Sequence, residues 1–148
     1  MTDPHALRIR PLPYDPDRLA EAVCAIRPRL LILFGSWATA SPPPGPESDV
    51  DMAILGCPKE KFWECYRLLS AACPEHELDL VRLEDADPLF RDEVMRQGVL
   101  LAGDPDQFCD YRAYAYRDFV DSADLFALEQ TLFEKKMANL KRQFDDSC

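Results

Sequence analysis

The stretch FGSWATASPPPGPESDVDMAIL, residues 34–55, joins two short apolar segments through a loop that is rich in proline. LLILF at 30–34 is too short for a helix and too apolar for a surface strand, so this pattern predicts a central β-strand. VDMAIL at 50–55 is predicted to form the next strand. The run SPPPGP at 41–46 is expected to be an exposed loop, because proline lacks a backbone N–H and restricts φ.

Three aspartates fall at the ends of predicted strands. Asp49 and Asp51 are two residues apart, so their carboxylates are expected on one face of the sheet. Two such carboxylates repel each other unless a cation or a proton lies between them, and oxygen ligands favour Mg²⁺ or Mn²⁺. Asp79 lies on a third predicted strand, ELDLVRL at 77–83, and faces away from its apolar neighbours. If these strands pair, the three carboxylates provide ligands for two ions about 4 Å apart.

The other end of the loop begins with Gly35 and Ser36. A glycine lets the backbone approach a ligand closely, and a serine at the start of a turn offers a hydroxyl and an N–H to a phosphate. The loop therefore combines anion-binding groups with cation-binding carboxylates, and a magnesium nucleotide needs both. Either feature alone is common in turns and strand ends without function. Their order and spacing together indicate a nucleotide site.

Length and charge limit the function classes. The chain has 148 residues, about the size of one domain, and a formal charge of −10, which argues against direct nucleic-acid binding and favours a cationic partner. No apolar run approaches the ~20 residues needed to span a membrane, and residues 1–15 lack the apolar core of a secretory signal. A cytoplasmic location is therefore expected. The six cysteines form no CxxC pair, and Cys65 and Cys73, eight residues apart, are interpreted as small buried hydrophobic side chains on one helix face.

The remaining pattern predicts an α/β fold, a mixed sheet flanked by helices. The expected helices are one that starts after Asp15-Pro16, one that carries Phe62, Tyr66 and Leu69, and one at 89–97. Gly98 is expected to end the last of these through a positive φ, before a short edge strand, VLLAG at 99–103. We divide the chain into a domain at 1–103 and a helical C-terminal extension at 104–148.

The helical extension begins at Asp104-Pro105 and carries a long apolar stripe. The stripe consists of Phe126, Phe133, Met137, Leu140 and Phe144. A stripe of this length typically marks a protein interface, and we expect it to bind a partner protein. The alternatives are that it folds back onto the core or forms a homodimer.

The residues quoted above resemble the signature of nucleotidyltransferases of the DNA polymerase β superfamily. That signature is a Gly-Ser at the end of one strand, a loop of about ten residues, and Asp-x-Asp on the next strand. Gly35-Ser36 and Asp49-Val50-Asp51 match it, and Asp79 in the sequence LDLV looks like the third carboxylate of the family. Over about residues 15–105 the chain is similar to the minimal nucleotidyltransferase (MNT) family, most of all to the MNT antitoxins of HEPN/MNT toxin–antitoxin pairs.

This resemblance implies a nucleotidyltransferase domain at 1–103 that transfers AMP from ATP, with two Mg²⁺ ions, to a tyrosine hydroxyl of a cognate HEPN ribonuclease toxin. It implies catalytic and metal-binding roles for Asp49, Asp51 and Asp79, and nucleotide binding by Gly35 and Ser36. The alternatives are a small-molecule, antibiotic-type nucleotidyltransferase and a non-catalytic antitoxin that neutralises its toxin by binding.

The sequence departs from the family pattern at two places. Twelve residues, 37–48, separate Ser36 from Asp49 where the family usually has ten, and Trp37-Ala38-Thr39 stands where the family often has an arginine. The side chain of Trp37 is expected to pack half-buried against the loop.

Overall fold

The protein folds around a four-stranded mixed sheet in the order β3-β2-β1-β4. The structure is a computed structural model that describes residues 12–39, 44–45 and 47–146. The strands are β1 (Leu30–Phe34), β2 (Val50–Leu55), β3 (Leu78–Arg82) and β4 (Val99–Gly103). β1 is antiparallel to β2 and β4, whereas β2 and β3 are parallel. The predicted mixed sheet with an edge strand is thus confirmed, while most of the loop predicted at 41–46 lies outside the described residues.

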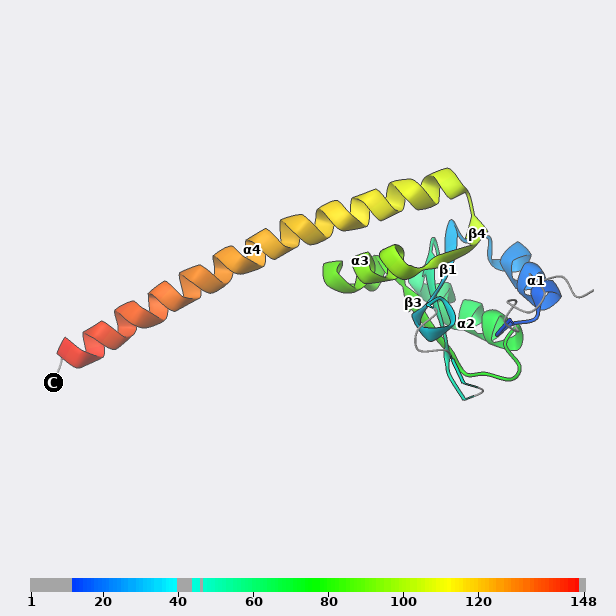
Figure 1. The fold of residues 1–148 in the computed structure, drawn as a ribbon, viewed down its shortest axis with the longest axis horizontal. Coiled ribbons are helices and arrows are strands. Elements are labelled where there is room, and N and C mark those ends of the chain that lie inside the picture. Colours follow the sequence, from blue (N-terminus) through cyan, green and yellow to red (C-terminus); the bar gives the residue numbers. More distant parts are fainter. Residues whose placement is uncertain (1–11, 40–43, 46, 147–148) are drawn as a thin grey trace, which may run out of the picture.

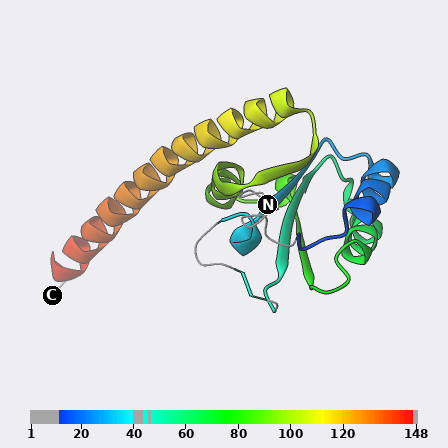
Figure 2. The same cartoon turned by 45° about the vertical axis from the view of Figure 1, so that its right-hand side comes forward.

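Helices cover both faces of the sheet (Figures 1 and 2). Helices α1 (Pro16–Ile26) and α2 (Phe62–Ala71) lie on one face, and α3 (Pro88–Gln97) and the first part of α4 (Pro105–Asp146) lie on the other. Local chemistry fixes two of the helix starts. The carboxylate of Asp15 accepts a hydrogen bond from the N–H of Asp17 at 2.9 Å, and that of Asp87 accepts one from the N–H of Phe90 at 2.8 Å, each before a proline in the first turn.

The alternation of side chains along the strands divides the core into two layers. Leu31 and Met52 belong to the layer under α1 and α2, whereas Ile32 and Ala53 belong to the layer under α3 and α4. By the same alternation Asp51, two residues before Ala53, belongs to the α3 face of the sheet. The apolar core therefore continues directly into a polar region at the end of β2.

Gly98 ends α3 for a different reason from the one predicted. Its φ is −74°, a value that any residue adopts, so the predicted positive φ is wrong. A Cβ at this position would instead collide with Cγ2 of Ile32 and the carbonyl oxygen of Val94. Glycine is required because the end of α3 packs directly against β1.

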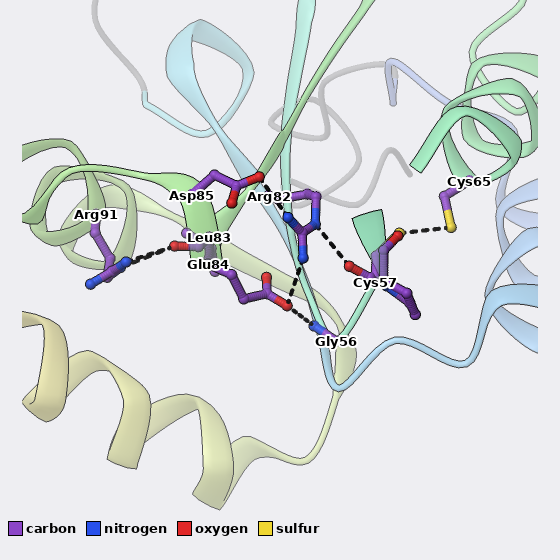
Figure 3. A network of polar contacts seen from close by, with 9 residues as sticks. Gly56, Cys57, Cys65, Arg82, Leu83, Glu84, Asp85 and Arg91 are labelled. Atoms are coloured by element: carbon purple, nitrogen blue, oxygen red, sulfur yellow. Dashed lines mark hydrogen bonds and ion pairs between the residues drawn. The ribbon is translucent and has the colours of Figure 1, made fainter. Parts of the chain in front are cut away.

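A polar network closes the ends of β2 and β3 that lie opposite the aspartates (Figure 3). Arg82 Nε donates to the carbonyl of Cys57 at 2.8 Å, and Arg82 Nη1 pairs with Asp85 Oδ2 at 2.6 Å. The N–H of Gly56 donates to Glu84 Oε2 at 3.0 Å. These contacts join the end of β2 to the turn after β3, which keeps the two parallel strands in register.

Helix α4 is one continuous helix of 42 residues that extends far beyond the sheet (Figure 1). The Arg91–Asp118 ion pair, at 3.1 Å, joins its first part to α3. Beyond Ser122 all residues at 123–144 are exposed. The predicted helical extension is confirmed, but the alternative that the apolar stripe folds back onto the core is wrong. Among the described residues no helix is apolar enough over a sufficient length to cross a bilayer.

Candidate active site

The sheet register brings two of the predicted site residues together. Asp51 lies directly opposite Asp79 in the parallel β2–β3 pair and opposite Phe34 in the antiparallel β1–β2 pair. Neighbouring strands are about 4.8 Å apart, so Asp51 and Asp79 are adjacent on one face. Asp49 lies just before β2, exposed to solvent, rather than on the strand. Asp51 and Asp79, 28 residues apart in sequence, are therefore neighbours beside the end of β1, and Asp49 precedes Asp51 by two residues.

The pKa of Asp51 reflects its position beside the other two carboxylates. Burial, and then the charges of Asp79 and Asp49, raise the pKa of Asp51 to about 6. The charged form is thus disfavoured both by desolvation and by like charge, which is the electrostatic situation that a bound cation relieves. Asp79 and Asp49 therefore lie close enough for their charges to act on Asp51.

The residue that follows β1 packs against this carboxylate. Gly35 has a φ of +75° and starts the short 3₁₀ turn Gly35–Trp37, which includes Ser36. A Cβ on Gly35 would collide with Oδ2 of Asp51. No side chain caps the N-terminal N–H groups of the turn. The predicted phosphate-binding turn is therefore in direct contact with Asp51, one of the three predicted cation-binding residues.

Trp37 joins the three segments that carry these residues. Its indole Nε1 donates to the carbonyl of Ser48 at 3.4 Å, immediately before Asp49. Its ring packs edge-on against His76, with ring centroids 5.1 Å apart, three residues before Asp79. The Nδ1 atom of His76 is buried and has no hydrogen-bond partner among the described residues. The expected half-buried packing of Trp37 is confirmed. Sequence reasoning missed the contacts of Trp37 with Ser48 and His76.

The donor set fits a hard divalent cation. All three side chains offer carboxylate oxygens, the ligands that Mg²⁺ prefers. Within the described part of the chain no group of three His, Cys, Asp or Glu residues is already arranged closely enough to hold an ion. Asp51 and Asp79 are already neighbours in the β2–β3 pair, so the sheet itself holds two of the three candidate ligands side by side.

A small cavity also adjoins Gly35. It has a volume of about 210 Å³ and lies between the end of β1 and helix α3. Sequence reasoning missed it, since the residues of α3 that line it belong to no motif and look like ordinary exposed helix positions. Only the packing of α3 across the sheet brings them to the site.

Comparison with protein families identifies one match. The family model described as polymerase beta, nucleotidyltransferase matches residues 24–107, more than half of the chain. The match includes β1, β2 and β3 and all five predicted site residues. A comparison with curated protein sequences finds no match.

Solved structures with the same fold are toxin–antitoxin complexes. One, a toxin–antitoxin with AMP-PNP, is 23% identical with a TM-score of 0.61 and covers 82% of this chain and 98% of that chain. A second, a tri-AMPylated HEPN toxin of Shewanella oneidensis in complex with an MNT antitoxin, is 21% identical with a TM-score of 0.57, covering 82% and 95%. A third, the complex MntA-HepT, is 22% identical with a TM-score of 0.56, covering 82% and 96%. At these identities the likeness establishes the fold.

Proposed function

The chain belongs to the polymerase beta nucleotidyltransferase family, and from this membership we propose that it transfers AMP from ATP to a tyrosine hydroxyl of a cognate HEPN-type toxin. In this role it acts as the antitoxin of the pair. One observation carries the proposal: Asp51 lies opposite Asp79 on the sheet and in contact with the Gly35 turn. Phosphate-binding and cation-binding groups thus adjoin each other, as nucleotidyl transfer requires.

Each site residue has a distinct role in this proposal. Asp49 and Asp51 hold Mg²⁺, and Asp79 serves as a third ligand or as the base that accepts the proton of the acceptor hydroxyl. The backbone N–H groups of Gly35 and Ser36, with the Ser36 hydroxyl, bind phosphate oxygens. Bound Mg²⁺ supplies positive charge that neutralises the phosphates and the transferred group.

The proposed reaction is an in-line displacement at the α-phosphorus of ATP. The tyrosine oxygen forms a bond to this phosphorus, the bond from the phosphorus to the bridging oxygen breaks, and pyrophosphate leaves. The hydroxyl proton passes to Asp79 or to solvent. Because β3 is an outer strand of the sheet, the acceptor approaches over β3, beside Asp79.

The partner assignment rests on the fold neighbours and on α4. Two of the solved structures with this fold are described as a HEPN toxin with an MNT antitoxin and as a toxin–antitoxin with AMP-PNP. In α4, Phe108 and Ala115 are buried against the core, and Phe126 and Phe133, which lie further along the same helical face, are 67% and 63% exposed. The apolar face of α4 continues beyond the part that packs on the sheet and α3. An exposed apolar face of this kind is typical of a surface that binds a partner protein. The formal charge of −10 favours a basic one.

A non-catalytic antitoxin is the second candidate. It is favoured by Trp37, which stands where the family often has an arginine and which contacts Ser48 and His76. In that case α4 still binds the toxin but no AMP is transferred. A small-molecule nucleotidyltransferase explains the exposed α4 stripe less well, since a small acceptor does not cover it.

The test uses the purified protein, ATP, Mg²⁺ and the product of the adjacent gene, followed by intact mass measurement of both proteins. We expect the partner to gain the mass of one or more AMP units, and the gain to disappear when Asp49→Asn and Asp51→Asn are combined. Complex formation without any mass gain would favour the non-catalytic antitoxin. Absence of both binding and transfer would contradict both antitoxin functions.

A further inference from the structure

The cavity beside Gly35 is lined by two residues at the end of β1 and four residues of α3. Its lining residues are Phe34, Gly35, Phe90, Glu93, Val94 and Gln97. The volume of about 210 Å³ is below the range of roughly 300–1,000 Å³ that holds a drug-sized molecule. The cavity is therefore suited to a single ring system rather than to a whole nucleotide.

The walls of the cavity match a flat heteroaromatic ring. Phe34 and Phe90 pack edge to face, with ring centroids 5.7 Å apart and an interplanar angle of 82°. Val94 closes the apolar part and is fully buried. Such walls favour an aromatic guest, because burial of an apolar ring face is favourable and ring edges and faces attract.

Two polar side chains are free to recognise the edge of such a ring. Glu93 and Gln97 are one helical turn apart on α3, and neither side chain has a hydrogen bond or ion pair among the described residues. A glutamine amide pairs with the amino group and ring nitrogen of adenine, and a carboxylate accepts from an amino group. At the edge formed by N7 and position 6, guanine presents a carbonyl oxygen in place of that amino group, so a carboxylate there faces an acceptor instead of a donor.

The position of the cavity relative to the carboxylates indicates which part of the substrates binds in the cavity. In the order β3-β2-β1-β4, Asp79 lies on β3, whereas the cavity lies at the end of β1, on the other side of Asp51. The acceptor is assigned to the β3 side, and the phosphates to the Gly35 turn. The β1 side is then the remaining position for the base of the nucleotide, and the cavity on that side is lined by Gly35.

We propose that this cavity is the nucleobase subsite, which binds adenine against the wall formed by Phe34 and Phe90 and selects it through Glu93 and Gln97. The proposal rests on the proposed function, since it assigns the base of the nucleotide whose phosphates that function places at Gly35. It adds specificity-determining residues that lie outside the Gly-Ser and Asp-x-Asp motifs.

The test measures binding of ATP, GTP and inorganic tripolyphosphate to the full chain by calorimetry in the presence of Mg²⁺. Tripolyphosphate has no base and reports on the phosphate site alone. We expect ATP to bind roughly tenfold more tightly than GTP or tripolyphosphate, the discrimination typical of a good bidentate base contact. Gln97→Ala and Glu93→Ala should each remove most of this preference and leave the affinity for tripolyphosphate unchanged.

Gln130→Ala provides the matched control, because Gln130 is an exposed glutamine on α4 far from the cavity. This variant should bind all three ligands as the unaltered protein does. Unchanged ATP affinity in both Gln97→Ala and Glu93→Ala would overturn the subsite while leaving the proposed function intact. Failure of the unaltered protein to bind either ATP or tripolyphosphate would overturn the proposed function and the subsite together.

Discussion

The backbone of Gly35 packs directly against the carboxylate of Asp51. A Cβ at Gly35 would collide with Oδ2 of Asp51, and the φ of +75° independently favours glycine there. The Gly-Ser turn and the Asp-x-Asp strand are thus a single site, although a loop separates them in sequence. A single methyl group added at Gly35 would therefore displace the Asp51 carboxylate.

Gly35→Ala should lose binding of Mg²⁺ with a nucleoside triphosphate and lower the free energy of unfolding by roughly 1–2 kcal/mol, the cost of a left-handed backbone at alanine. Thermal unfolding with and without Mg²⁺-ATP measures both effects. Gly45→Ala is the matched control, because nothing lies within 4 Å of a Cβ there. Retention of the full ligand-induced stabilisation in Gly35→Ala would contradict the assigned site.

Asp51→Asn should raise the melting temperature at pH 7.5 in the absence of divalent cations. The pKa of Asp51 is raised to about 6 in the folded protein, above its ordinary value of ~3.9, so the folded state prefers the protonated form. Stability therefore falls as the pH rises through this window, and the gain from asparagine should be largest above pH 6 and vanish near pH 4. Mg²⁺ with ATP should stabilise the unaltered protein but not the variant. An identical gain in Asp124→Asn, at an exposed position of α4, would contradict this explanation.

Trp37→Phe should weaken Mg²⁺-ATP binding more than it weakens the fold. Phenylalanine keeps the ring contact with His76 but loses the hydrogen bond to the Ser48 carbonyl, worth about 0.5–1.5 kcal/mol, and so releases the segment that carries Asp49. Calorimetric titration and thermal unfolding separate the two effects. Trp63→Phe, at an exposed tryptophan of α2, should change neither quantity. Equal affinities in the two variants would mean that Trp37 does not position Asp49.

Phe133→Asp combined with Leu140→Asp should abolish binding of the toxin and AMP transfer to it, yet preserve the fold. Both side chains are exposed, at 63% and 41%, so their replacement removes no core contact. Gel filtration of the mixed proteins measures complex formation, and calorimetry checks that ATP binding is unchanged. Trp63→Asp replaces an apolar residue of α2 that is still more exposed, at 73%, and this variant should bind the toxin normally. Normal modification of the toxin by the double variant would place the docking surface elsewhere.

The cysteines should divide into two reactivity classes when the native protein is treated with iodoacetamide at pH 8. Cys24 and Cys109 are exposed and free, and should be alkylated first. Cys57 and Cys73 are buried, and burial raises the pKa of Cys57 to about 12 and that of Cys73 to about 11, which leaves little reactive thiolate. Peptide mass spectrometry before and after urea unfolding measures the difference. Equal rates for all four thiols in the native protein would contradict the predicted packing of these cysteines.

The strands that carry the site could be predicted because their signals are local. The strands predicted at 30–34 and 50–55 have the observed bounds, and the strand predicted at 77–83 is observed at Leu78–Arg82, one residue shorter at each end. The sequence located the end of α3 at Gly98, but it did not show why a glycine is needed there. The clash that a Cβ would make with Ile32 arises between residues distant in sequence, and no local preference encodes it.

The sequence by itself determined the mixed α/β pattern, the family motif and which carboxylates are candidates for binding a cation, since spacing along a strand decides which side chains share a face. Only the tertiary structure decided that Asp51 lies opposite Asp79, that Trp37 bridges Ser48 and His76, and that α3 completes a cavity at Gly35. It also decided that the α4 stripe is uncovered, because α3 and the sheet end before it. These relationships depend on strand register and helix packing, which are set by the cooperative burial of two apolar layers rather than by any local run of residues.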